Sequence, residues 1–200
     1  MKSKLLTALL LSAGLVGSAF AGAGVTTEFE VENGKNGNAD SRSISVAPFY
    51  KFENGIKADV KFEGSRDTGH DAAGNNNSVG GLIEARVRKD YSLTDRLSAG
   101  VRLGIGENIN GTNKAGQTVD FTYYTVEPIV TYKVSDVLSL NTSYRYRNAF
   151  NQDNYTYKTN TAKIGAAYAL TKQDEVGLKY FEKYGDTRTN GVEFIYTRGF

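Results

Sequence analysis

The chain has 200 residues, enough for one domain, with 24 Lys and Arg against 22 Asp and Glu. This near-neutral charge argues against a nucleic-acid-binding protein, which would be clearly basic. The chain has no cysteine, which excludes disulfides, thiolate metal sites and attachment of a lipid to a cysteine. Thirteen Tyr and ten Phe, with only two Pro, are typical of a strand-rich chain.

The first residues have the pattern of a cleaved signal peptide. Lys2 and Lys4 precede an apolar run that ends at Phe20, and residues 19–21 (Ala-Phe-Ala) match the small-x-small site of a signal peptidase. The run is about 16 residues long, which is short for a membrane helix of about 20 residues. We therefore expect residues 1–21 to be removed and residues 22–200 to form the folded domain, with 22 basic and 22 acidic residues.

Alternating side chains and turn-forming residues predict ten β-strands in the rest of the chain. In chain order they cover residues 25–32, 42–52, 56–66, 79–91, 96–107, 118–134, 138–150, 155–170, 175–185 and 190–200. Two features of the sixth strand are irregular: Tyr123 and Tyr124 interrupt the alternation, which indicates a bulge, and Pro128 lies in mid-strand, where it cannot donate a hydrogen bond.

The connections between these strands alternate in length. Tight turns at residues 53–55, 92–95, 135–137 and 171–174 alternate with Gly- and Asn-rich loops at 33–41, 67–78, 108–117 and 151–154, and a short connection at 186–189. Short periplasmic turns and longer external loops are typical of outer-membrane barrels. The expected fold is all-β, a closed antiparallel transmembrane β-barrel of about ten strands, with twelve as the alternative.

One face of each predicted strand is apolar, as in Val101, Leu103 and Ile105, and we expect that face to contact lipid. The last strand shares this pattern and ends on an aromatic residue. Its apolar stripe resembles the C-terminal signal by which outer-membrane barrels are recognised for insertion. The stripe is interrupted only by Arg198, and its aromatic members, the expected assembly signal, are Phe194, Tyr196 and Phe200.

The opposite face of the strands, which would line the lumen, carries many charges. The basic residues expected to line a pore are Arg86, Arg88, Arg102, Arg145, Arg147 and Lys163. The acidic residues expected there are Glu28, Glu30, Glu32 and Glu193. Strand order places the acidic set opposite the basic set, so we expect an acidic wall to face a cationic wall, with a strong field between them.

Two interpretations of this charged lumen stay open. Guanidinium groups match carboxylates bidentately, so a row of arginines could bind and relay anions through a conducting pore. Alternatively, the charges neutralise one another and fill the barrel, because about eight strands enclose only side chains whereas about sixteen enclose a channel. Gly100, Gly104 and Gly106 fit neither a phosphate loop nor a turn, and we expect them to leave room for bulky lumen neighbours such as Arg102.

Residues 140–147, Leu-Asn-Thr-Ser-Tyr-Arg-Tyr-Arg, follow a tight turn that contains Asp136. This stretch resembles the arginine-tyrosine-arginine strand of the oligogalacturonate-specific porin family, small monomeric outer-membrane porins for acidic sugars. Residues 83–103, which include Arg86, Arg88 and Arg102, are similar to the central hairpin of that family. The resemblance covers a third to half of the chain that follows the signal peptide.

The resemblance implies that Arg145 and Arg147, together with the three arginines of the hairpin, line a path for anions, acidic oligosaccharides in particular. The family has twelve strands, however, and this sequence predicts ten, with three rather than five after the arginine motif. Pore width and substrate class therefore depend on the strand count.

The sequence offers little for enzyme chemistry, which needs a positioned nucleophile or acid–base group. His70 is the only histidine and lies in a loop rich in Gly and Asn, where a solvated role is the usual one. Asp67, Asp71 and Asn75 could touch a calcium ion, but their spacing does not match a calcium loop. We expect no enzymatic activity, no catalytic residue, no metal site and no cofactor.

These observations predict a porin that allows passive diffusion of small solutes, anionic ones above all. The alternative is a structural or adhesive barrel without a conducting pore. Either protein would be a monomer in the outer membrane of a Gram-negative bacterium, exported by the signal peptide and inserted by the barrel-assembly machinery. Its partners would be outer-membrane lipid, lipopolysaccharide and small anionic solutes, and not nucleic acid.

Overall fold

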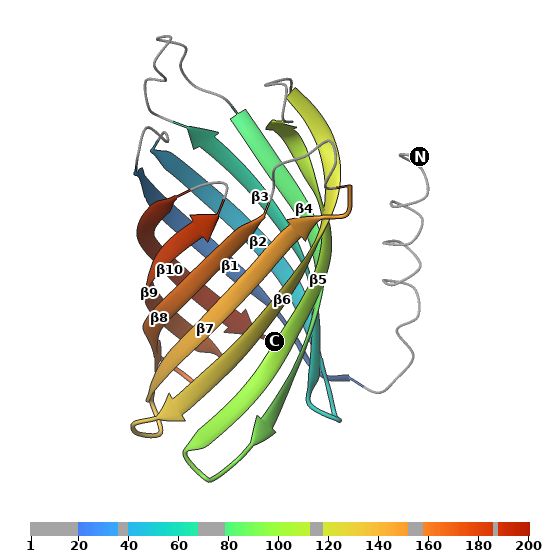
Figure 1. Cartoon of the computed structure of the whole chain (residues 1–200). Coiled ribbons are helices and arrows are strands. Elements are labelled where there is room, and N and C mark those ends of the chain that lie inside the picture. Colours follow the sequence, from blue (N-terminus) through green and yellow to red (C-terminus); the bar gives the residue numbers. More distant parts are fainter. Residues whose placement is uncertain (1–19, 36–39, 68–78, 113–117, 152–157, 186–187) are drawn as a thin grey trace.

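The computed structural model describes residues 20–35, 40–67, 79–112, 118–151, 158–185 and 188–200. These residues form ten strands: β1 (Phe20–Gly34), β2 (Ser41–Phe52), β3 (Ile56–Asp67), β4 (Val79–Ser92), β5 (Leu97–Thr112), β6 (Thr118–Lys133), β7 (Leu138–Ala149), β8 (Thr159–Ala169), β9 (Asp174–Gly185) and β10 (Thr189–Gly199). Each strand pairs with its neighbours in sequence, and β1 pairs with β10, so the sheet closes into a barrel (Figure 1). The prediction of an all-β, closed antiparallel barrel is confirmed, with ten strands.

The strand boundaries differ from the predicted ones in two main places. β1 begins five residues before Val25, and β5 continues to Thr112 through an Asn- and Gly-rich stretch that had been expected to be a loop. Backbone hydrogen bonds between strands do not depend on the side chains. Pairing with an adjacent strand can therefore continue a strand beyond the residues whose side chains alternate. The proposed cleavage after Ala21 falls inside β1 and stays a prediction.

The two ends of the barrel have different connections, and we name them the turn rim and the loop rim. Short turns join β2–β3, β4–β5, β6–β7 and β8–β9 at the turn rim, where the hydroxyls of Thr94, Ser135 and Thr171 each accept a hydrogen bond from the backbone N–H three residues later. Gly55 has φ = +77°, the left-handed conformation that its turn requires. The other strand ends, which flank the longer connections in the sequence, lie at the loop rim (Figure 1).

Both chain ends of the barrel lie at the turn rim. Gly24 pairs with Gly199, and the N–H of Phe200 donates to the carbonyl of Ala23 over 2.8 Å. With an even number of strands this arrangement is required. It places the residues that open β1 and close β10 on the same side of the membrane.

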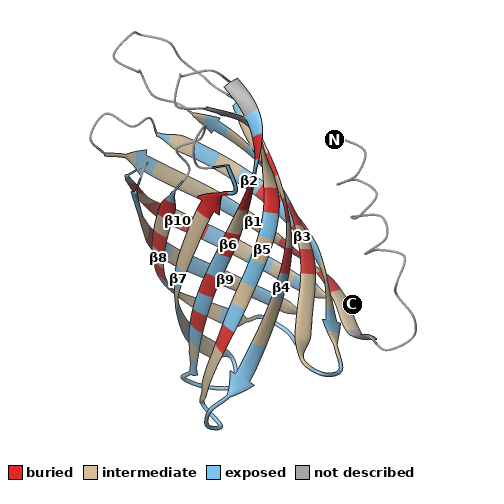
Figure 2. Ribbon diagram, turned by 45° about the vertical axis from the view of Figure 1, so that its right-hand side comes forward, coloured by how far each residue is buried: buried red, intermediate tan, exposed pale blue. Residues whose placement is uncertain are grey.

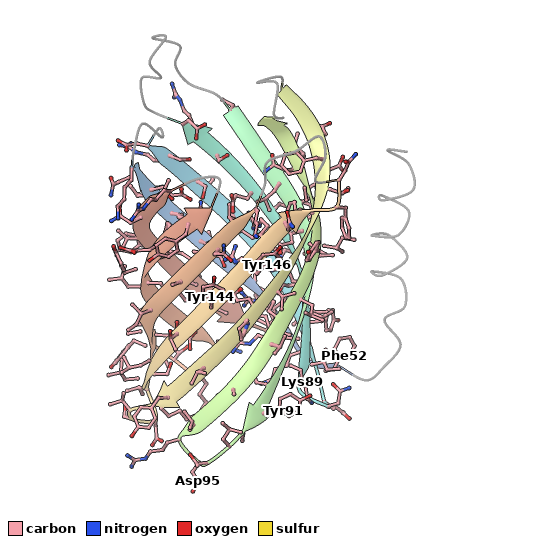
Figure 3. The ribbon with its side chains drawn as sticks, in the orientation of Figure 1. Phe52, Lys89, Tyr91, Asp95, Tyr144 and Tyr146 are labelled. Atoms are coloured by element: carbon pink, nitrogen blue, oxygen red, sulfur yellow. The ribbon has the colours of Figure 1, made fainter. Side chains whose placement is uncertain are left out.

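Buried and exposed residues alternate along the strands, as Figure 2 shows. The outward face is apolar, and Leu103, Ile105 and Phe194 expose about half of their surface there. Figure 3 shows Tyr144 and Tyr146 on the outer face of β7, and Phe52 and Tyr91 towards the turn rim. An outer band of apolar residues bordered by aromatic ones is the surface of a membrane barrel.

The sixth strand is regular at the position where a bulge was expected, so that prediction is wrong. Tyr123 pairs with Gly106 and Tyr124 with Ile105 in unbroken register. Tyr123 points inward with 0% of its surface exposed, whereas Tyr124 packs against Tyr146 outside the barrel, with ring centroids 6.0 Å apart. Tyrosine suits both faces, so two consecutive tyrosines do not break the alternation.

The two prolines of the chain are accommodated without a change of register. Pairing of β6 with β7 skips Glu127 and Pro128, and pairing of β2 with β3 skips Ala47 and Pro48. In each case the same register resumes on the other side of the gap. A proline has no N–H to donate, so the sheet loses hydrogen bonds locally but stays closed.

Inside the barrel, aromatic rings lie over glycines of the neighbouring strand. Tyr123, Phe181 and Phe49 pair directly with Gly106, Gly191 and Gly24. A Cβ atom on Gly106 would lie 2.6 Å from the hydroxyl of Tyr123, and one on Gly191 would lie 2.6 Å from the Phe181 ring. These glycines give the rings the space to turn into the lumen.

Two further glycines of β5, Gly100 and Gly104, leave room for polar neighbours. A Cβ on Gly104 would lie 2.3 Å from Glu84 Oε1, and one on Gly100 would lie 2.1 Å from Asp90 Oδ1. The expectation that these glycines accommodate bulky lumen side chains is confirmed. The occupants that come closest are Asp90, Glu84 and Tyr123 rather than Arg102.

Candidate functional site: the charged lumen

All ten charged residues predicted to line a pore have the inward orientation on their strands. The acidic ones are Glu28, Glu30 and Glu32 on β1 and Glu193 on β10, and the basic ones are Arg86 and Arg88 on β4, Arg102 on β5, Arg145 and Arg147 on β7 and Lys163 on β8. They are inward because each pairs with, or lies two residues from, a buried lumen residue. Whether they line a conducting pore stays a prediction.

The acidic and cationic residues do not form two separate walls. Carboxylates from other strands lie among the arginines, and ion pairs join the two sets.

Glu127 on β6 is shared by three side chains. It is 4% exposed and accepts a hydrogen bond from Arg102 over 3.0 Å and from the hydroxyl of Ser143 over 2.8 Å. The Nε of Arg145 lies 3.6 Å from the same carboxylate. Two of the predicted pore arginines are therefore neutralised in part by one buried acid.

Glu84 on β4 has an equivalent role for Arg147. The carboxylate is 2% exposed and lies 3.4 Å from the Arg147 guanidinium. It also accepts hydrogen bonds from Thr125 over 2.7 Å and from the Tyr123 hydroxyl over 3.3 Å. Arg147 lies over the Tyr123 ring, 4.7 Å from its centroid, which is a cation–π arrangement.

The acids of β1 and β10 pair with lysines. Lys61 lies 2.7 Å from Glu28, which also accepts a hydrogen bond from Ser45. Lys163 lies 2.8 Å from Glu193, and the two side chains are 4% and 2% exposed. Lys183 contacts Glu32 in the same way, closer to the loop rim.

The remaining two arginines pair locally. Arg86 contacts Asp59 on the adjacent strand β3, and both side chains are buried. Arg88 contacts Asp90 two residues further along β4, where the carboxylate is 40% exposed. Charges on β3 thus pair across the sheet, Asp59 with Arg86 on β4 and Lys61 with Glu28 on β1.

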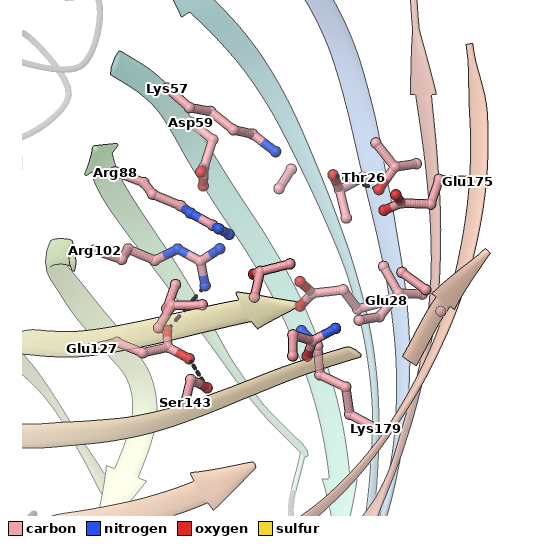
Figure 4. A pocket seen from close by; sticks show the side chains of 18 of the residues that line it. Thr26, Glu28, Lys57, Asp59, Arg88, Arg102, Glu127, Ser143, Glu175 and Lys179 are labelled. Carbon is pink, nitrogen blue, oxygen red and sulfur yellow. Dashed lines mark hydrogen bonds and ion pairs between the residues drawn. The ribbon is translucent and has the colours of Figure 1, made fainter. Parts of the chain in front are cut away.

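A cavity of about 240 Å³ lies in the half of the lumen next to the turn rim (Figure 4). Lys57, Arg88 and Arg102 project into it from β3, β4 and β5, and Glu28 and Lys179 project from the opposite side. Lys57 pairs with Arg88 and Arg88 with Arg102 in the sheet register, so three cationic residues form a row on one wall.

Two cations of this cavity lack an acidic partner. Among the residues that the structure describes, no carboxylate oxygen lies within 4.0 Å of the Nζ of Lys57 or of Lys179. The Nε of Arg102 is also buried and has no hydrogen-bond partner among the described residues. A small anion in the cavity would therefore meet donors that the protein leaves available.

Sequence reasoning missed several residues of the lumen. Glu84, Tyr123, Phe181 and Lys179 are central to it, and none was named as a lumen residue. Their inward parity was available, since Glu84 lies two residues before Arg86 and Lys179 lies two before Phe181. The predicted list named arginines and one lysine on one side and the glutamates of the first and last strands on the other, and so did not include them.

The described residues offer little to support other chemistry. They contain no group of three or more His, Asp or Glu side chains placed to hold a metal ion. His70, Asp71 and Asn75 lie outside these residues, so the weak calcium alternative is not tested. In the same described ranges there is no helix long and apolar enough to cross a membrane.

Solved structures similar to this chain include an outer-membrane channel, an autotransporter domain and a porin. The COG4313 outer membrane channel from Pseudomonas putida F1 is 8% identical, with 92% of this chain and 97% of that chain covered and a TM-score of 0.59. The β domain of the Bordetella autotransporter BrkA is 12% identical, with 92% and 100% covered and a TM-score of 0.56. The KdgM porin in complex with disordered oligogalacturonate is also 12% identical, with 88% and 99% covered and a TM-score of 0.49.

No protein-family model matches the sequence, and no curated protein matches it. At these identities the structural likeness establishes the fold alone. The fold defines the class: this protein is a closed ten-stranded antiparallel β-barrel with an apolar outer face and a charged lumen, similar in fold to an outer-membrane channel.

Proposed function

We propose that this protein is a narrow outer-membrane porin through which small anionic solutes diffuse. The observation that carries the proposal is the cavity near the turn rim, where Lys57, Arg88 and Arg102 form one cationic wall and two lysines have no described acidic partner. A barrel that served only as a scaffold would gain nothing from unpaired cations inside its lumen.

Arg145 and Arg147 would continue the cationic path from the cavity towards the loop rim. Their interaction with Glu127 and Glu84 would hold them in place along this path. The resemblance of residues 140–147 to the arginine-rich strand of the oligogalacturonate porins makes acidic oligosaccharides the candidate solutes. In this proposal the protein is a monomer without enzymatic activity or cofactor, inserted by the barrel-assembly machinery and surrounded by lipid and lipopolysaccharide.

A second function is favoured by a specific observation. In the middle of the lumen Tyr123, Phe181, Glu84 and Glu193 are each at most 2% exposed. Side chains this well covered leave little room for a solute, as expected for a barrel close to the eight-stranded size. If no solute passes them, the protein is a structural or adhesive barrel.

Ion selectivity in planar bilayers separates these functions. We expect wild-type protein to conduct with a preference for anions under a salt gradient. Replacing Arg145 and Arg147 together by Gln removes two positive charges and leaves Glu84 and Glu127 less neutralised, so the reversal potential should shift towards cation selectivity. Trigalacturonate should also block the double variant less than the wild type.

The matched control neutralises Arg96 and Lys172, which are exposed in turns outside the lumen. This control should keep the wild-type reversal potential and the wild-type block. An unchanged potential in the variant of Arg145 and Arg147 would contradict the anion path. A wild-type protein that is folded but does not conduct would favour the structural barrel.

A further inference from the structure

Two arginines face lipid at the loop rim of the barrel. Arg42 on β2 and Arg66 on β3 have the outward orientation, are exposed, and lie directly opposite each other in the sheet register. Their neighbours in the same row are Val31 on β1 and Val79 on β4. Like charges in directly opposed positions destabilise a sheet, so this pair calls for an anion from elsewhere.

The described part of the chain does not supply that anion. No Asp or Glu oxygen in these residues lies within 4.0 Å of either guanidinium. Asp67 is the acid next in sequence to Arg66, but it has the inward orientation and pairs with Ser41. The two arginines therefore lie side by side on the outer face of the sheet without an acidic partner among the described residues.

Next to this pair, on the side towards the turn rim, the outer face has a strip without side chains that consists of Gly64 and Gly81. Gly64 is two residues from Arg66 and pairs with Ile44 on one side and with Gly81 on the other. A Cβ atom on Gly64 would meet nothing within 4 Å. The strip is bordered by Ile44 and Phe62, which are 58% and 48% exposed.

The position along the strands matches the boundary between headgroups and hydrocarbon. Below Arg42 and Arg66, the outward residues of β2 and β3 carry no charge as far as the turn rim, whereas the sheet ends one residue above them. The cost of an arginine facing lipid is large at mid-membrane and falls towards zero at the interface. We expect that interface to be the external one, because longer connections are typical of the external end of such barrels.

We propose that Arg42, Arg66 and the Gly64 strip form a binding site for a phosphorylated acyl lipid of the outer leaflet, of the lipid A kind. The two guanidinium groups would hold a lipid phosphate by bidentate hydrogen bonds. An acyl chain attached near that phosphate would lie on the bare strip beside Ile44 and Phe62. The site is on the outside of the barrel and does not depend on conduction through the lumen.

Native mass spectrometry of the purified full chain in detergent tests this site, with diphosphoryl lipid A as the probe. We expect the wild type to retain lipid A, and R42Q/R66Q to bind it roughly tenfold more weakly, since charge-assisted hydrogen bonds are lost. R42K/R66K, which keeps the charges without the bidentate geometry, should bind with intermediate affinity. Resistance to heat in gels checks that each variant is folded.

Two further variants separate a built site from general attraction. Arg96→Gln with Lys172→Gln removes the same charge at the turn rim and should bind lipid A like the wild type. Gly64→Val keeps both arginines but fills the strip, and should weaken binding of lipid A without weakening retention of inorganic phosphate.

Several results would overturn the proposal. Equal binding by the wild type and by R42Q/R66Q, or an equal loss in the turn-rim control, would remove the site. Dephosphorylated lipid A bound as tightly as the phosphorylated form would show that the arginines take no part. Inorganic phosphate that displaces lipid A completely at equal concentration would show a small-anion site instead of a lipid site.

Discussion

At the scale of single residues, the lumen is organised by buried carboxylates rather than by arginines. Glu127 contacts Arg102, Arg145 and Ser143, and Glu84 contacts Arg147, Thr125 and Tyr123. Burying an ionised carboxylate without such partners costs much free energy relative to leaving it in water. Each carboxylate therefore fixes the position of the cations around it.

We predict that Glu127→Gln destabilises the barrel. The substitution leaves Arg102 and Arg145, whose side chains are 16% and 14% exposed, without the charge that compensates them. The free energy of unfolding should fall by about 1–3 kcal/mol, measured by urea titration of the barrel in lipid vesicles. Ser143→Ala, which removes one neutral hydrogen bond to the same carboxylate, should cost about 1 kcal/mol. Equal midpoints for the two variants and the wild type would contradict this role of Glu127.

The orientation of these residues could be predicted from the sequence, but their partners could not. Parity alone tells that Arg147 and Glu84 face the lumen. Their contact joins β7 to β4, three strands away, and Lys61 reaches Glu28 from two strands away. Such contacts depend on the tilt and stagger of the strands in the closed sheet. The alternation of side chains along one strand determines neither the tilt nor the stagger. For this reason the prediction of an acidic wall that faces a separate cationic wall was wrong.

At the scale of elements, the strands were predictable because both faces of each strand are specified. An apolar outer residue and a polar inner residue alternate through most of each strand, so a shift by one residue would reverse both faces. The alternation predicted all ten strands. It could not predict the polar end of β5, where pairing with β6 rather than side-chain pattern continues the strand.

The last strand also permits a prediction about assembly. Phe194 and Tyr196 lie on the outward face of β10. Phe200, the residue after β10, continues the same alternation and is 74% exposed. Deleting Phe200 should reduce the amount of heat-resistant protein in the outer membrane, because the aromatic stripe then ends at Tyr196, four residues earlier. Fractionation and gel mobility of the heated and unheated protein measure this amount.

Phe200→Tyr is the control, since it keeps an aromatic ring at the same position, and it should assemble like the wild type. Normal accumulation of the truncated protein would mean that the terminal residue is not part of an assembly signal. Poor accumulation of both variants would indicate that the position tolerates no change and would leave the aromatic character without a role.

At the scale of the whole molecule, the two rims must lie on opposite sides of the membrane. We predict that the turn rim is periplasmic and the loop rim external. The chain has no cysteine, so Asp136→Cys at the turn rim and Asn151→Cys at the loop rim each provide a single exposed thiol. A maleimide that does not cross membranes should label only Asn151→Cys in intact cells, and both variants after lysis. The reverse pattern would contradict the orientation.

The pairing of rings with glycines inside the barrel has a consequence for engineering. The wall is a closed hydrogen-bonded sheet, and the residues opposite Tyr123, which are Gly106 and Ala149, have no side chain long enough to fill the space left by the ring. Truncating Tyr123 would therefore widen the lumen locally instead of letting it collapse. The aperture of this barrel is adjustable one side chain at a time, which is the property sought in a scaffold for small sensing nanopores.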